Sequence, residues 1–146
     1  MIHPIIKEDI KRIIKRLRSN IDKLSGKTVL ITGASGLIGS YIVETIAVLN
    51  SEKKLHKPCN VIALQKSVIT QNSRLGYLLD RVDIQFISHN AIFPYLPHVK
   101  IDYFIHAAGM SEPAFFLADH LGTIDVNVRG IRWILEYAKK HKVQSV

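Results

Sequence analysis

Hydrophobic and polar positions follow two different periods along this chain. Isoleucine and leucine recur every third or fourth position through residues 6–24, which places them on one face of a helix. The same spacing predicts further helices over 37–49, about 70–79 and 121–141. Short runs rich in β-branched residues predict strands at 27–32, 60–64, 83–88 and 101–106.

Strands that alternate with helices favour a parallel sheet covered on both faces, which is a doubly wound α/β fold. Pro94 and Pro97 predict a loop over 89–100 in place of a crossover helix. Residues 143–146 enter a fifth strand as the sequence ends, so we expect a sheet cut short after its fourth strand. We expect two parts: an amphipathic helical extension over 1–26 and an incomplete domain over 27–146.

Composition narrows the class of protein. The 146 residues are 47% hydrophobic and hold one cysteine, Cys59, which excludes an internal disulfide framework and a zinc site built on several cysteines. No apolar run approaches the roughly 18 residues of a membrane span, and the amino terminus is too charged for a signal peptide. We therefore expect a soluble cytoplasmic protein.

The net charge of +8 is concentrated near the amino terminus, because residues 1–27 carry eight basic and three acidic side chains. A basic amphipathic helix can bind a membrane surface or an acidic partner. The plainer interpretation is a helix that packs on the domain and turns its charges to solvent. We adopt the plainer interpretation and expect no nucleic-acid partner.

The candidate chemistry lies at 32–39, TGASGLIG, where the first predicted domain strand gives way to a helix. Gly33 permits a tight turn, Gly36 lets the backbone approach a pyrophosphate, and Gly39 lets the helix pack close to the sheet. Free N–H groups from Ser35 to Ile38 and the positive end of the helix dipole favour phosphate. The Ser35 hydroxyl adds a donor. The turn predicts a Rossmann-type site for a nicotinamide dinucleotide.

Over residues 27–146 the chain resembles the extended short-chain dehydrogenase/reductases, and within them the NAD-dependent epimerase/dehydratases of nucleotide sugars. The resemblance rests on TGASGLIG, on His106, Ala107, Ala108 and Gly109 after the fourth strand, and on Asn127 and Gly130. It implies that 106–109 line the cofactor and that Asn127 supports the site by satisfying nearby backbone. It also implies that 121–141, with Trp133, packs between the subunits of a homodimer.

The ends of the second and third strands depart from the family pattern. An acidic residue usually accepts from the adenosine ribose of NAD, and this chain has Gln65 followed by Lys66. Gln65 can bond a ribose hydroxyl, whereas Lys66 can neutralise the 2′-phosphate of NADP. We expect NAD and keep NADP as the alternative. Asn90, with Ala91, stands where the family contacts adenine.

The family chemistry depends on a Tyr and a Lys four residues apart, where the Tyr deprotonates the sugar hydroxyl. None of the five tyrosines is followed by lysine at that spacing. We expect no catalytic residue in this chain, which is interpreted as the NAD(P)-binding part of a nucleotide-sugar epimerase/dehydratase. The catalytic residues and sugar pocket would lie in a missing carboxyl-terminal part. The alternative is a self-contained dinucleotide-sensing module. Ser111 and Glu112 are weak candidates for reaching the substrate or nicotinamide.

Overall fold

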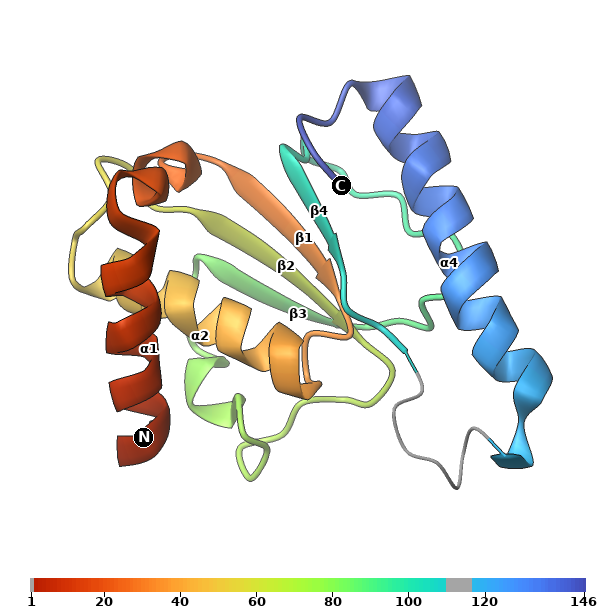
Figure 1. The fold of residues 1–146 in the computed structure, drawn as a ribbon, viewed down its shortest axis with the longest axis horizontal. Helices are drawn as coiled ribbons and strands as arrows, with labels where there is room; N and C mark the ends of the chain where they lie inside the picture. Colours follow the sequence, from red (N-terminus) through yellow and green to blue (C-terminus); the bar gives the residue numbers. More distant parts are fainter. Residues whose placement is uncertain (1, 110–116) are drawn as a thin grey trace.

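The computed structural model describes residues 2–109 and 117–146, and it shows a parallel β-sheet between layers of helices (Figure 1). In the described residues the sheet has four strands in the order β3-β2-β1-β4. Their bounds are β1 Thr28–Thr32, β2 Asn60–Gln65, β3 Ile84–Ser88 and β4 Tyr103–His106. All four predicted strands are confirmed within two residues, and so is the doubly wound α/β class.

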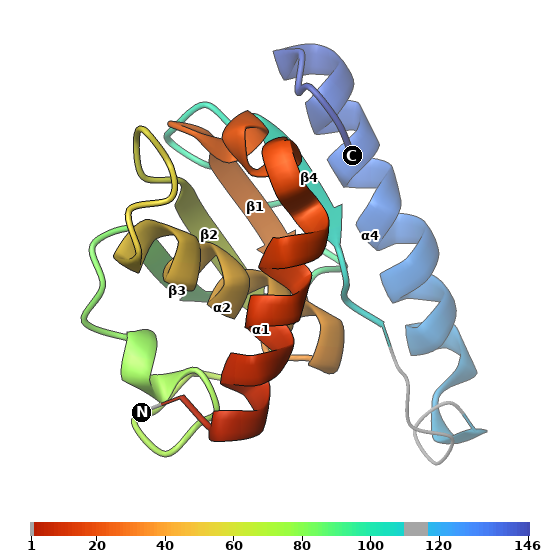
Figure 2. The same ribbon diagram turned by 60° about the vertical axis from the view of Figure 1, so that its left-hand side comes forward.

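Within residues 2–109 and 117–146, three α-helices cover the two faces of the sheet. Helices α1 (Pro4–Leu17) and α2 (Leu37–Ser51) lie on one face and α4 (His120–His141) on the other (Figures 1 and 2). Both faces of the sheet need to be covered because successive side chains of a strand point to opposite faces. Val29 and Ile31 of β1 are buried in the cluster that holds α1 and α2, whereas Leu30 between them is buried with Trp133 of α4. The predicted helices 37–49 and 121–141 are confirmed.

The predicted helix over 6–24 is shorter than expected. Helix α1 ends at Leu17, and a 3₁₀ helix, η1 (Arg18–Leu24), continues the chain. Arg18 has a φ of 50° and a ψ of −132°, which breaks the α-helical ladder. Ile10 and Ile14 are buried against the α2 side of the sheet. The apolar stripe that predicted the helix is therefore used for packing.

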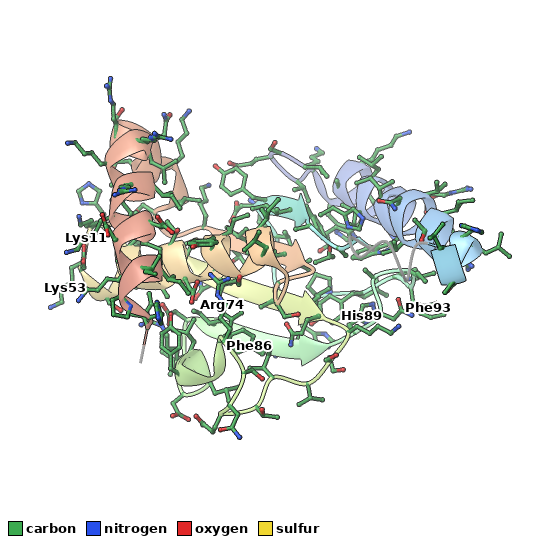
Figure 3. The ribbon with its side chains drawn as sticks, turned by 60° about the horizontal axis from the view of Figure 1, so that its bottom comes forward. Lys11, Lys53, Arg74, Phe86, His89 and Phe93 are labelled. Atoms are coloured by element: carbon green, nitrogen blue, oxygen red, sulfur yellow. The ribbon has the colours of Figure 1, made fainter. Side chains whose placement is uncertain are left out.

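The helix predicted over 70–79 is wrong. That crossover is a loop with one short 3₁₀ helix, η2 (Gly76–Leu78). A Cβ at Gly76 would lie 2.5 Å from the Gln71 carbonyl oxygen, so the loop folds tightly on itself. Arg74 reaches across to α2 and pairs with Glu44 at 2.6 Å (Figure 3). Two buried leucines, Leu75 and Leu78, produced the helical spacing without a helix.

The segment between β3 and β4 is a loop, as the prolines predict. At the carboxyl terminus, the Phe104 amide donates to the Ser145 carbonyl at 3.0 Å, and Tyr103 and Ser145 form a parallel bridge. Residues 143–146 therefore begin to pair beside β4, where the predicted fifth strand would lie. None of the described helices is both long and apolar enough to cross a membrane.

Candidate functional site

The turn after β1 is held against both neighbouring strands. The Ala34 amide donates to the Leu64 carbonyl at 3.1 Å, and the Gly36 amide donates to Gly33 at 3.0 Å. Gly33 has a φ of 68°, and a Cβ there would lie 2.5 Å from the Ala107 carbonyl oxygen. Glycine is thus required at position 33 both by the backbone conformation and by the close approach of β4.

The turn leaves the amino end of α2 open to solvent. Ser40 is the first residue of this helix whose amide bonds a backbone carbonyl, that of Gly36 at 2.9 Å. The amides of Leu37, Ile38 and Gly39 precede it and have no partner among the described residues. Ser35, Gly36, Leu37 and Ile38 are exposed. Unpaired amides at the positive end of a 15-residue helix form a site for an anion.

Gly36 and Gly39 have different surroundings. A Cβ at Gly39 would clash with the Gly33 carbonyl, so this glycine is required by packing. A Cβ at Gly36 would meet only the Gly33 oxygen, at 3.2 Å, and its other surroundings are open. Gly36 has an ordinary φ of −69°. The structure itself therefore does not explain why residue 36 is glycine, whereas a ligand lying against it would.

At the end of β2, Gln65 is 3% exposed, and its Oε1 has no hydrogen-bond donor among the described residues. A buried acceptor without a donor is costly, so the atom fits a ligand hydroxyl. Lys66 beside it is exposed. At the end of β3, the Asn90 Oδ1 accepts from the Ile92 amide at 3.2 Å and shapes a turn. Ala91 is buried, and its carbonyl accepts from Trp133 Nε1 at 2.8 Å.

His106 joins three elements at the end of β4. Its Nε2 lies 3.1 Å from the Val126 carbonyl of α4, and its Nδ1 lies 2.7 Å from Thr32 Oγ1 of β1. A carbonyl only accepts, so Nε2 carries the proton and Nδ1 accepts from the threonine hydroxyl. Burial lowers the pKa of His106 below its usual range, and the bond to Val126 offsets part of this effect. His106 is therefore a neutral positioning group.

The residues around His106 bring α4 close to the sheet. The Ala107 amide donates to the Thr32 carbonyl at 3.0 Å, which continues the pairing of β4 with β1. A Cβ at Gly130 would lie 3.1 Å from both the Ala91 oxygen and His106 Cε1. Asn127 donates to the Thr123 carbonyl of its own helix at 2.8 Å. Ala107 and Ala108 are half-buried, and Gly109 is exposed. Ser111 and Glu112 lie outside the described residues.

The structure thus brings most of the predicted site residues to the carboxyl edge of the sheet, around the open start of α2. The Asn127 amide donates to the backbone carbonyl of Thr123 within α4, which is the kind of contact expected for it. Sequence reasoning missed Thr32 as the partner of His106. Part of the signal was present, because Thr32 and His106 each end a predicted strand, but their pairing comes from the structure.

A buried carboxylate was also missed. Glu44 is 1% exposed on α2, where Arg74 pairs with it and the Tyr77 hydroxyl donates to it at 3.2 Å. Burial and this carboxylate together raise the pKa of Tyr77. Because every group in the cluster has a partner, it fastens the crossover loop to α2. Its only sequence signal is one acidic residue within an apolar helix.

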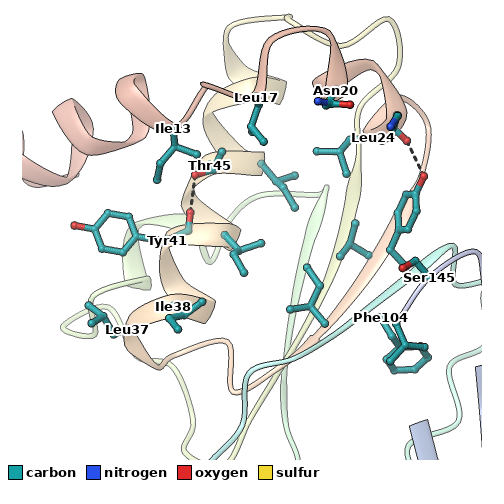
Figure 4. Close-up of a pocket in the computed structure, with 17 residues that line it drawn as sticks. Ile13, Leu17, Asn20, Leu24, Leu37, Ile38, Tyr41, Thr45, Phe104 and Ser145 are labelled. Atoms are coloured by element: carbon teal, nitrogen blue, oxygen red, sulfur yellow. Dashed lines mark hydrogen bonds between the residues drawn. The ribbon is translucent and has the colours of Figure 1, made fainter. Parts of the chain in front are cut away.

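A groove of about 1020 Å³ lies between α1, α2 and β4 (Figure 4). Its walls are mainly apolar, and they include Leu17, Leu24 and Tyr103. It reaches the glycine turn through the exposed side chains of Leu37 and Ile38. Such a surface is suited to packing against polypeptide and offers no constellation for catalysis.

A parallel sheet in this strand order, with a glycine turn opening the first sheet helix, defines a Rossmann-type dinucleotide-binding fold. The chain belongs to the NAD-dependent epimerase/dehydratase family, whose sequence model matches residues 29–146. No curated protein sequence matches the chain.

Solved structures of similar fold include dTDP-glucose 4,6-dehydratase DesIV from Streptomyces venezuelae, a double mutant with NAD and DAU bound. It is 20% identical with a TM-score of 0.61 over 79% of this chain and 36% of that one. UDP-glucose 4-epimerase from Thermus thermophilus, in complex with NAD, is 20% identical and has a TM-score of 0.54. The match covers 80% of this chain and 35% of that one. UDP-glucose 4-epimerase from Thermotoga maritima is 19% identical and has a TM-score of 0.57, with 80% of this chain and 35% of that one covered. The chain spans about a third of these proteins.

Proposed function

We propose that this chain is the NAD-binding part of a nucleotide-sugar epimerase or dehydratase. The observation that carries the proposal is the open start of α2, where the unpaired amides of Leu37, Ile38 and Gly39 follow the exposed Gly36. A pyrophosphate would accept from these amides and from the Ser35 hydroxyl. The similar structures solved with bound NAD support this choice of dinucleotide.

The remaining site residues would hold the rest of the cofactor. The orphan Oε1 of Gln65 would accept from an adenosine ribose hydroxyl, and Asn90 with Ala91 would border the adenine. Ala107, Ala108 and Gly109 would form the wall beside the nicotinamide, with His106 fixing the end of β4. Bound NAD supplies a hydride acceptor for the transient oxidation of a sugar hydroxyl. Lys66 keeps NADP as the alternative, because an exposed lysine there can neutralise a 2′-phosphate.

Replacing Gly36 with valine tests the site. The φ of −69° at position 36 suits any residue, and an added Cβ would need only a small shift from the Gly33 oxygen at 3.2 Å. We therefore expect the fold to survive while the branched side chain blocks the pyrophosphate. Calorimetric titration should show an NAD affinity at least about tenfold weaker, since several charge-assisted hydrogen bonds are lost. Asn72→Val, which places the same valine side chain on the exposed crossover, is the control.

Unchanged NAD binding by folded Gly36→Val would refute the proposed site. The same titration of the unaltered chain with NADP decides the cofactor. Tighter binding of NADP than of NAD would overturn the preference for NAD and assign Lys66 to the 2′-phosphate.

The catalytic Tyr and Lys and the sugar pocket would come from polypeptide outside these 146 residues. Two observations support this: the chain spans about a third of the similar structures, and an apolar groove beside β4 is suited to further polypeptide. The second candidate function is a dinucleotide-sensing module. It is favoured because none of the five tyrosines is followed by a lysine four residues later. Mass spectrometry of the native protein separates the two, because a species of only 146 residues that binds NAD supports the sensing module.

The protein would act as a homodimer through α4. Trp133 is buried toward the sheet, so it is not available to a partner. The opposite side of α4 exposes Leu121, Ile124, Val128 and Leu135, each more than half exposed. Their spacing of three, four and seven residues forms one apolar stripe, which is typical of a helix that packs against a second helix.

A further inference from the structure

The net charge of the molecule is confined to two segments. Residues 1–27 and 52–57 together hold eleven basic and four acidic side chains, which is +7 of the total +8. The other 113 residues are nearly neutral, with nine basic and eight acidic side chains. The charge is therefore a local property of one part of the surface.

The fold brings these two segments together. Helix α1 packs across α2 (Figures 1 and 2), and the turn after α2 lies beside the end of α1. A groove of about 420 Å³ is lined by Lys11, Lys15 and Arg18 from the first segment and by Glu52 and Lys54 from the second. Lys11 and Lys53 lie on the same side of the molecule in Figure 3. We define the basic surface as Lys11, Lys15, Arg16, Arg18, Lys53 and Lys54.

Most cations of the basic surface are uncompensated. Lys11, Lys15, Arg16 and Arg18 are exposed and form no ion pair with any described residue. The acidic residues nearby are engaged, since Glu8 pairs with Arg12 and Glu52 pairs with Lys54. A second groove of about 520 Å³ is lined only by Arg12, Lys15, Arg16 and Arg18. Apart from Lys54, which pairs with Glu52, the cations of the basic surface have no counter-charge among the described residues.

The turn after α2, which contributes Lys53 and Lys54 to the basic surface, is remote from the candidate dinucleotide site. Helix α2 begins at the glycine turn and ends at Ser51, next to Lys53. Its 15 residues span about 22 Å at 1.5 Å per residue. The turn at Lys53 and Lys54 is therefore the part of the basic surface far from the open start of α2, whereas Arg16 lines a groove with Tyr41, one turn into that helix.

The composition of the surface indicates the kind of partner. Residues 4–24 and 52–57 contain no Phe, Tyr or Trp, so the surface lacks the rings on which single-stranded nucleic acid stacks its bases. The apolar side of α1 is buried through Ile10 and Ile14 and cannot enter a bilayer. Long basic side chains and the exposed Ile5 at one end of α1 remain. These fit a layer of anionic headgroups.

We propose that the basic surface docks the protein on anionic phospholipid membranes, with the dinucleotide site facing the aqueous phase. The contact is electrostatic and peripheral. It uses no residue of the proposed NAD site, whose open amides belong to Leu37, Ile38 and Gly39.

The test is flotation of the full chain with vesicles of phosphatidylcholine containing 30 mol% phosphatidylserine, and with phosphatidylcholine vesicles alone. We expect binding only to the anionic vesicles at low salt and release near 1 M NaCl, where charges are screened within a few ångströms. The variant Lys11→Gln, Lys15→Gln, Lys53→Gln should lower the partition coefficient about 100-fold, because each basic residue near such a surface contributes about fivefold.

The matched control is Lys139→Gln, Lys140→Gln, Lys142→Gln at the end of α4. Each triple removes two exposed helical lysines and one lysine of positive φ. Equal loss in both triples, or no binding to the anionic vesicles at low salt, would overturn the proposal. Tighter binding to a 20-nucleotide RNA than to the vesicles, lost in the first triple, would also overturn it by assigning the surface to nucleic acid. Calorimetry with NAD on both triples keeps this result separate from the cofactor site.

Discussion

At the scale of the residue, His106 shows how one side chain can depend on its neutral form. It donates to Val126 and in its neutral form accepts from Thr32, so protonation of Nδ1 would require the threonine hydroxyl to turn away and give up its donation. Burial acts in the same direction and lowers the pKa of His106. Its contribution to stability is therefore complete above the unfolded pKa of about 6.5 and is lost as pH falls through the lower folded value.

We predict that urea unfolding shows this loss between pH 8 and pH 5. The unaltered chain should lose more stability across that range than His106→Asn, which has no proton to gain at this position. His98→Asn, at an exposed site, should keep the full pH dependence. If His106→Asn retains the same slope as the unaltered chain, His106 is not held neutral by the contacts described above.

At the scale of the element, helix α1 belongs to the core even though it precedes the part of the chain that the family model matches. Ile10 is fully buried and packs in the same cluster as Val43 and Ile46 of α2. Asp9 accepts from the Tyr41 hydroxyl at 2.8 Å, which raises the pKa of that tyrosine and ties the two helices on their outer side. The predicted boundary between an extension over 1–26 and a domain over 27–146 therefore stays a prediction. In the structure, α1 packs against α2 across that boundary.

Replacing Ile10 with alanine tests the role of α1. We expect a loss of about 2–5 kcal/mol in the free energy of unfolding, since the cavity lies within close-packed side chains. Ile5→Ala, on the exposed side of the same helix, should change stability by less than about 0.5 kcal/mol. Denaturant unfolding of both variants gives the comparison. Equal effects would mean that α1 is an appendage.

The apolar stripe of α4 gives a second prediction at this scale. Replacing Ile124 and Val128 with glutamate would place charges in the proposed helix pairing and should convert a dimer to a monomer. Sedimentation velocity measures this change. Arg129→Glu and Lys140→Glu place glutamates on exposed positions of the same helix away from the apolar stripe and should leave the dimer intact. A monomer for the unaltered chain at high micromolar concentration would contradict the homodimer.

At the scale of the whole molecule, we expect the chain to bind NAD without catalysing the conversion of a nucleotide sugar. The chain presents a dinucleotide site, but none of its tyrosines has lysine four residues later. We predict that the 146 residues bind NAD and produce no NADH and no epimer or dehydrated product from UDP-glucose or dTDP-glucose. Absorbance at 340 nm and chromatography of the nucleotide sugars give the measurement. Turnover by the pure chain would show that another residue acts as the base.

Local residue patterns were sufficient for the strands, for helices α2 and α4, and for the glycine turn. The reason is that a two-residue or a 3.6-residue period, and the need for φ above zero at Gly33, are properties of a few neighbouring positions. The helix predicted over 70–79 failed because Leu75 and Leu78 mimic a helical stripe, while the contact that shapes the loop joins Arg74 to Glu44 thirty residues earlier.

The sequence by itself determined the elements, their order and the candidate phosphate turn, since each depends on residues close together in the chain. Only the tertiary structure decided which groups far apart in the chain meet. It placed His106 between Thr32 and Val126 and the two basic segments on one surface, and it left the buried oxygen of Gln65 without a partner among the described residues. Hydrogen-bond partners, burial and charge density depend on three-dimensional proximity, which no local pattern specifies.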